Sequence, residues 1–150
     1  MNSTLKGKPT APSIILMIVA ASGFIMSISG CRFSKKPSTV VENLIRTVER
    51  GEIEQAAAYM SQGFVSRQGI DTIKESLRQT ALWIKKDGGI KSLKILKEDA
   101  VGDVAEVIVQ ITRGGGDSSV VYYKLIREKG DWKIDGVVSD PTLPAPSVTP

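Results

Sequence analysis

The 150-residue sequence predicts an α+β domain, in which N-terminal helices pack on one face of an antiparallel sheet. Apolar residues recur at helical spacing in the first half of the domain and alternate with polar residues in the second half. No proline lies between Ser38 and Asp140. Because proline interrupts helices and central strands, we expect residues 38–140 to form one continuously structured domain.

The first predicted helix begins at the pattern Thr39-x-x-Glu42, which has the form of a capping box. We expect it to end at Gly51, since glycine favours helix ends. The apolar residues behind the cap share one face at i, i+3, i+4 and i+7 spacing. They are Val41, Leu44, Ile45 and Val48.

Two further helices are predicted before the pattern changes to strands. A short helix over residues 53–60 repeats the helical spacing, and Gly63 is expected to stop it. A third helix is expected to start at Asp71, an N-cap candidate, and to end at Gly88-Gly89. Residues 64–66, between these helices, are predicted to be a short strand or a connection.

Alternating segments then predict a four-stranded meander. The segment Gly114-Gly115-Gly116-Asp117 indicates a hairpin, because it joins two alternating runs and does not open a helix as a phosphate-binding loop would. Gly130-Asp131 indicates a second turn. The expected strands cover residues 93–96, 104–112, 120–127 and 132–138.

Residues 1–30 have the three parts of a secretory signal. Lys6 and Lys8 supply the positive start, and residues 14–28 supply an apolar stretch of about 15 residues, short of the ~20 that a membrane-spanning helix needs. Cys31, the only cysteine, follows directly after Gly30.

The sequence Ile28-Ser29-Gly30-Cys31 resembles the lipobox of bacterial lipoproteins. The resemblance implies cleavage between Gly30 and Cys31 and a diacylglycerol on the Cys31 sulfur, which would anchor the chain to a membrane. Arg32 stands where an aspartate retains some lipoproteins at an inner membrane, so the resemblance implies the outer membrane, facing the periplasm, in a cell with two membranes. The alternative is an uncleaved membrane anchor with an incidental cysteine.

The predicted organisation therefore has four parts. A signal peptide over residues 1–30 precedes a lipidated tether over residues 31–37. The α+β domain covers residues 38–140. Residues 141–150 form a Pro-rich, solvated tail that is either inert or in contact with the cell wall or a partner.

Composition excludes several classes of function. The sequence has no histidine, and its one cysteine is expected to carry lipid, which excludes zinc sites and Cys-His or Ser-His-Asp catalysis. We expect no cofactor and no metal. The net charge is +4 and the two signs are interspersed without a long basic run, so a nucleic-acid partner is not expected.

Two motifs resemble the nuclear-transport-factor-two-like, or cystatin-like, cone superfamily. Residues 127–135 are similar to its last hairpin, where Gly-x-Trp-Lys-Ile is typical, and here read Gly130-Asp131-Trp132-Lys133-Ile134. Residues 48–57 are similar to its helical start, Gly-Asp-x-x-x-Ala, with Glu52 in place of the aspartate. The resemblance implies a curved sheet that encloses a pocket, which relatives use for isomerases, dehydratases or ligand carriage.

Several polar and aromatic side chains could face such a pocket or an interface. Some of these side chains have a simpler structural explanation. This is core packing for Trp132, packing near helix ends for Tyr59 and Trp83, and a solvated sheet face for Glu106 and Gln110. Tyr122 and Tyr123 must point to opposite faces of their strand. The candidates are Tyr59, Trp83, Glu106, Gln110, Tyr122, Tyr123 and Asp135.

Three functional hypotheses follow. The first is a non-enzymatic, membrane-anchored envelope lipoprotein whose cone domain binds a protein partner or a small apolar ligand, with a homodimer formed through the sheet. The second is a pocket enzyme of the isomerase or dehydratase type, which needs a carboxylate base with a raised pKa near a tyrosine, with Glu106 and Asp135 as the carboxylates. The third is a structural part of a secretion or envelope-transport assembly.

Overall fold

The computed structural model describes residues 35–140. The chain divides into the units Met1–Cys31 and Arg32–Pro150, and the described residues all belong to the second unit. Gly30, Cys31 and the Pro-rich tail lie outside the described residues, so lipidation, cleavage and the character of the tail stay predictions.

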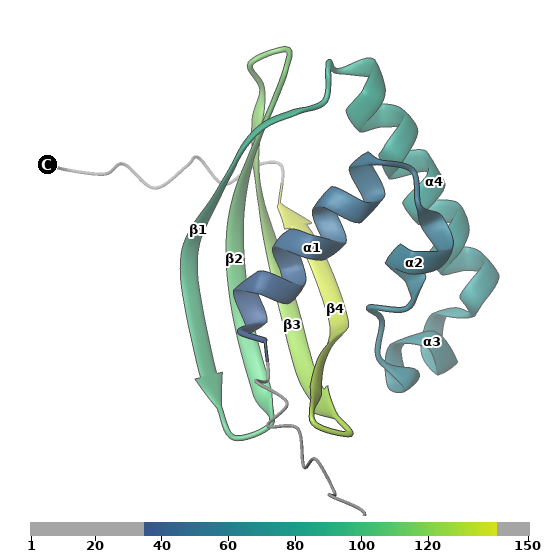
Figure 1. The fold of residues 1–150 in the computed structure, drawn as a ribbon, viewed down its shortest axis with the longest axis vertical. Helices are drawn as coiled ribbons and strands as arrows, with labels where there is room; N and C mark the ends of the chain where they lie inside the picture. Colours follow the sequence, from purple (N-terminus) through teal and green to yellow (C-terminus); the bar gives the residue numbers. More distant parts are fainter. Residues whose placement is uncertain (1–34, 141–150) are drawn as a thin grey trace, which may run out of the picture. The chain divides into compact units, whose positions relative to one another are not determined.

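Within residues 35–140, four helices precede one four-stranded sheet. Figure 1 shows how these elements are arranged. The strands follow chain order, and each pairs antiparallel with its neighbour. The predicted α+β class is confirmed. None of the helices in residues 35–140 combines the length and apolar character needed to cross a membrane. The elements are α1 (Pro37–Glu49), α2 (Ile53–Ala57), α3 (Gln62–Gln68), α4 (Ile70–Lys86), β1 (Ile90–Val101), β2 (Val104–Arg113), β3 (Ser118–Glu128) and β4 (Asp131–Asp140).

The helical half differs from the prediction at α3. Gly63 does not stop a helix but lies inside α3, and residues 64–66 are helical rather than extended. Ser61 explains the difference, because its hydroxyl oxygen accepts a hydrogen bond from the Phe64 amide at 2.9 Å and so caps a new helix. Gly69, at φ 81°, separates α3 from α4, which begins at Ile70 rather than at a cap on Asp71.

The predicted capping box at the start of α1 is also wrong. The helix begins earlier, with Pro37 at its first position, and no side chain caps it. Proline suits this position because the first helical N–H has no partner within the helix. Thr39 and Glu42 therefore both lie within the helix, and Pro37 is buried rather than part of a tether.

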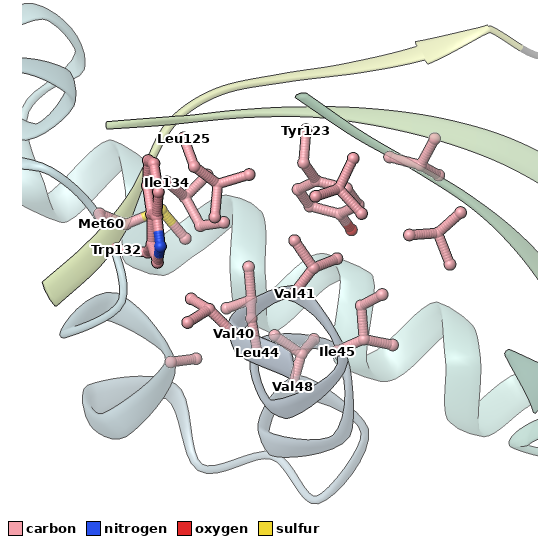
Figure 2. Close-up of a cluster of buried hydrophobic side chains, with 14 of the residues drawn as sticks. Val40, Val41, Leu44, Ile45, Val48, Met60, Tyr123, Leu125, Trp132 and Ile134 are labelled. Carbon is pink, nitrogen blue, oxygen red and sulfur yellow. The ribbon is translucent and has the colours of Figure 1, made fainter. Parts of the chain in front are cut away.

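The core lies between α1, α2, α4 and the inner face of the sheet. The predicted alternation is present along β2, and the structure shows that Ala105, Val107 and Val109 are the buried set. Figure 2 shows side chains of α1 pointing toward the sheet residues Tyr123, Leu125 and Ile134. Because the core cluster of the described residues runs from Val40 to Ile134, we expect the fragment Arg32–Pro150 to fold on its own.

The turn between β2 and β3 packs against the loop between α4 and β1. The Gly114 amide donates to the Gly89 carbonyl at 2.9 Å, and the Gly115 amide donates to the Asp87 carbonyl at 2.8 Å. The contact is so close that a Cβ atom on Gly114 would lie 2.4 Å from the Gly88 oxygen. This contact fixes the end of α4 against the end of β2.

Candidate functional site: an apolar cavity between the helices and the sheet

A cavity of about 530 Å³ lies between α1, α4 and the inner face of the sheet. This volume is within the range of cavities that hold small molecules, about 300–1,000 Å³. The helices contribute Leu44, Ile45 and Val48 from α1 and Leu77 and Ile84 from α4. The strands contribute Ile111, Val121 and Tyr123, among others.

The sequence forms this cavity because two amphipathic helices face one side of the sheet. The α1 residues share a helical face, and Leu77 and Ile84 lie seven residues apart on α4, which places them on one side of that helix. The cavity residues of β2 and β3 all have odd numbers. Odd-numbered residues of these two strands pair with each other, so these residues share the inner face. Trp83 and Val137 line the cavity near its rim and are 50% and 41% exposed.

Tyr123 places a hydroxyl inside this apolar region. The residue is 7% exposed, and Figure 2 shows its ring pointing from β3 toward α1. Burial raises the pKa of Tyr123, so the hydroxyl stays protonated at ordinary pH. No hydrogen bond joins it to another residue within 35–140, so it is free to bind a ligand.

Arg113 is the charged residue of the cavity lining. Its guanidinium carbon lies 3.9 Å from the centre of the Trp83 ring, and its Nε lies 2.9 Å from Oδ2 of Asp87. The ion pair is close, but its geometry does not make a hydrogen bond, and Nε is buried without a hydrogen-bond partner among the described residues. The residue is 7% exposed.

The two carboxylates that the enzyme hypothesis requires lie elsewhere. Glu106 is exposed on the outer face of the sheet. Asp135 lies beside α3, where it accepts hydrogen bonds from the Ser61 hydroxyl at 2.7 Å and from Arg67 at 2.9 Å. Burial raises the pKa of Asp135, but these two hydrogen bonds and the charge of Arg67 outweigh burial and hold that pKa below its usual value. The described cavity lining contains no aspartate or glutamate.

Tyr59 and Trp132 also lie outside the described lining of the cavity. Tyr59 is half-buried against the core, and its carbonyl accepts a hydrogen bond from the Ile134 amide at 2.8 Å. Trp132 is buried, as expected for a core aromatic, with Arg127 stacked on its ring at 4.6 Å. Of the predicted site residues, Trp83 and Tyr123 therefore meet in the cavity.

The outer face of the sheet holds Gln110 and Tyr122. Tyr122 pairs with Ile108 on one side and Val138 on the other, which gives an apolar row across three strands. No outer-face residue belongs to the core cluster. Tyr122 is thus the tyrosine available for a sheet-mediated homodimer, which stays a prediction, whereas buried Tyr123 is not available for it.

A second hollow, of about 660 Å³, lies where the end of α1 approaches α4. Its walls include the cations Arg50 and Arg78. Both are already paired, Arg50 with Glu52 at 2.9 Å and Arg78 with Glu75 at 3.2 Å. Paired surface charges around an open hollow make it a weaker ligand site than the apolar cavity. Residues 35–140 contain no cluster of acidic side chains suited to a metal ion.

Sequence reasoning did not identify Arg113 as a site residue. The signal was present, because the inward positions 105, 107, 109 and 111 of β2 continue to 113 at the same spacing. A cation at an inward position of a strand is unusual and indicates a buried partner or a ligand.

No protein-family model matches the chain, and no curated protein matches it in sequence. The structure is similar to that of a Campylobacter jejuni protein provisionally named an NTF2-like transpeptidase, with a TM-score of 0.60 and 16% identity over 67% of this chain and 97% of the other. A SEC-C motif containing protein from Rhodopseudomonas palustris matches with a TM-score of 0.51 and 13% identity over 70% of this chain and 79% of the other.

An NTF2-like protein of unknown function from Cytophaga hutchinsonii matches with a TM-score of 0.42 and 16% identity, over 73% of this chain and 95% of the other. At 16% identity, the likeness to the Campylobacter jejuni protein shows the fold and not the function. The predicted α+β cone fold of NTF2-like proteins, with a curved and unclosed sheet, is therefore confirmed.

Proposed function

We propose that this protein is an exported bacterial lipoprotein, anchored through Cys31, whose cone domain binds a small, mainly apolar ligand. The anchor is supported by the lipobox-like sequence that ends at Cys31. The ligand is supported by the cavity of about 530 Å³ between α1, α4 and the sheet. The cavity carries most weight, because its size and its few polar groups are typical of small-molecule sites.

The lining supports binding rather than catalysis. Acid–base catalysis needs a donor and an acceptor with pKa values near the working pH. The described lining offers Tyr123, whose pKa is raised by burial, and Arg113, whose guanidinium has N–H donors and no acceptor. Neither group can accept a proton from a substrate at neutral pH. Apolar surface removed from water contributes about 25 cal/mol per Å², and this is the main source of affinity that the lining provides.

The first experiment is native mass spectrometry of the fragment Arg32–Pro150, purified from bacterial cells without detergent. A stoichiometric added mass that denaturation releases is the expected result, and its identity gives the ligand class. If the fragment has no bound mass, and also fails to take up the neutral fluorescent probe N-phenylnaphthylamine, the cavity proposal is wrong.

Filling the cavity is expected to abolish binding. Val121 is buried on the inner face of β3 and lines the cavity, so Val121→Trp places an indole in the space that the ligand occupies. We expect N-phenylnaphthylamine affinity to fall at least tenfold, measured by fluorescence titration. The matched control is Val138→Trp, because Val138 is exposed on the outer face of the adjacent strand and should leave affinity unchanged.

Equal affinity of wild type and Val121→Trp would place the probe outside the cavity and contradict the proposal. A far-ultraviolet circular dichroism spectrum like that of the wild type is required of both variants, since overpacking can disturb a core.

Replacing Cys31 with serine tests the anchor. In the full-length chain we expect Cys31→Ser to accumulate as the uncut precursor and to incorporate no radiolabelled palmitate, because serine provides no sulfur for the diacylglycerol. The wild type should carry the label and migrate as the shorter, processed form on gels. Normal processing of the variant, or an unlabelled wild type, would remove the lipobox assignment and leave the cavity proposal untouched.

A further inference from the structure

We propose that the ligand of the cavity is an amphipathic anion, with an apolar body between α1 and α4 and a carboxylate or similar anionic head group bound by Arg113. This inference rests on the proposed function and specifies its ligand. It follows from the burial of Arg113, from the shortage of acceptors around its guanidinium, and from the lack of other charge in the lining.

Arg113 is held at the cavity by the backbone around it. It is the last residue of β2, at an inward position, and it pairs with Ile90 of β1. The next residue, Gly114, packs directly against the α4–β1 loop. Trp83 lies against the guanidinium at 3.9 Å and fixes the plane of the group. The cation is therefore positioned before any ligand binds, which reduces the entropy cost of binding.

The hydrogen-bonding capacity of Arg113 is unused. A guanidinium carries five N–H donors, and each buried donor without an acceptor costs free energy. Nε is buried without a hydrogen-bond partner, and no described residue accepts a hydrogen bond from either terminal nitrogen of Arg113. The terminal nitrogens, unlike Nε, are not fully buried, so a ligand in the cavity can reach them. A carboxylate that enters through the cavity could accept two of them at once.

Asp87 balances this cation only in part. It approaches the Nε side, at 2.9 Å, and its own side chain is 28% exposed to solvent. No described residue accepts a hydrogen bond from the terminal nitrogens, which therefore remain available to a second anion. Arg113 is the one charged residue of the described lining, so the electrostatic preference inside the cavity is for an anionic head group.

Matched probes separate this inference from the proposed function. Anilinonaphthalene sulfonate and N-phenylnaphthylamine share an aromatic body, and only the first carries an anionic group. Decanoate and decanol provide the same comparison in displacement titrations. With the fragment Arg32–Pro150 we expect both aromatic probes to bind, and each anion to bind about 10- to 100-fold more tightly than its neutral counterpart, the range expected for charge-assisted hydrogen bonds.

The chain provides a matched control variant. Arg113→Gln should remove the preference for the anions, measured within the variant as the ratio of the affinity of each anion to that of its neutral counterpart. Arg127→Gln removes another arginine that stacks on a tryptophan, Trp132, outside the cavity, and should change neither affinity.

Each result bears on one proposal or the other. If wild type binds the neutral probes but shows no preference for the anions, the anionic ligand is excluded and the apolar cavity stands. If the preference persists in Arg113→Gln, the head group binds elsewhere. If neither neutral probe binds, the cavity proposal itself fails. The wild-type comparison needs no variant, so the inference stays testable even if Arg113→Gln does not fold.

Discussion

Replacing Gly114 with alanine is expected to lower the free energy of unfolding by about 3 kcal/mol or more, whereas the neighbouring Gly115→Ala should change it little. An added Cβ at Gly114 would lie 2.4 Å from the Gly88 oxygen and 2.7 Å from the Gly88 carbonyl carbon. Both are backbone atoms, so no side-chain rotation can relieve the overlap. At Gly115 the nearest atom, the Asp87 oxygen, is 3.8 Å away, which is an ordinary contact.

Thermal unfolding of the fragment Arg32–Pro150 measures this difference. Neither glycine has a positive φ, so backbone strain does not distinguish the two variants. A loss of about 3 kcal/mol corresponds to a fall in Tm of roughly 12–24 °C for a domain of this size. Equal Tm values for the two variants would show that the α4–β1 loop can move away from the turn at little cost.

This contact also links stability to the site. The loop that packs on Gly114 carries Asp87, and the strand that ends there carries Arg113. If the loop moves in Gly114→Ala, the position of the guanidinium relative to Trp83 changes with it. We therefore expect any folded Gly114→Ala protein to lose part of the preference for anionic probes.

The turns before and after β3 were predictable from the sequence because local chemistry marks them, whereas β1 runs over Ile90–Val101 and not only over the predicted residues 93–96. Gly114-Gly115-Gly116-Asp117 and Gly130-Asp131 mark both predicted turns. The helical half was less predictable. Ser61 caps α3, but a lone serine before Gly63 is also typical of a loop, and only the packing of α3 against α4 and β4 decides between them.

The site was predictable only in part, for a geometrical reason. Period 2 places Tyr122 and Tyr123 on opposite faces, but it does not say which face is inner. Pairing of Tyr123 with Val107, a fully buried residue, decides this. The cavity itself depends on the separation of α4 from the sheet. No local pattern contains that distance, so neither the volume nor the place of Arg113 beside Trp83 follows from the sequence.

Replacing Asp135 with asparagine is expected to lower the free energy of unfolding at pH 7 by about 2 kcal/mol, the contribution typical of hydrogen bonds to a charged group. The ionised carboxylate accepts a hydrogen bond from Ser61, whose hydroxyl is fully buried, and from Arg67. Asp99→Asn is the matched control. Asp99 pairs with Lys97 at 2.6 Å, but both side chains are more than half exposed, so this loss should stay within about 0.5 kcal/mol.

The effect of Asp135→Asn should depend on pH with a definite sign. The pKa of Asp135 is lowered in the folded state, so its stabilising contribution is present above the unfolded pKa of about 3.9 and is lost as pH falls through the folded pKa. The free energies of unfolding of wild type and variant, measured with urea, should therefore differ by a constant amount from pH 7 to pH 5. This difference should become smaller below pH 4.

This profile also tests the role of the carboxylate. A catalytic base in a dry cavity would have a raised pKa, and its ionised form would destabilise the fold, so that removing the charge would stabilise the protein at neutral pH. An asparagine variant more stable than wild type at pH 7 would thus return Asp135 to the candidates for proton transfer. Destabilisation that disappears in acid would instead make Asp135 a structural anion, which joins the capped start of α3 to β4 and leaves the cavity without a base.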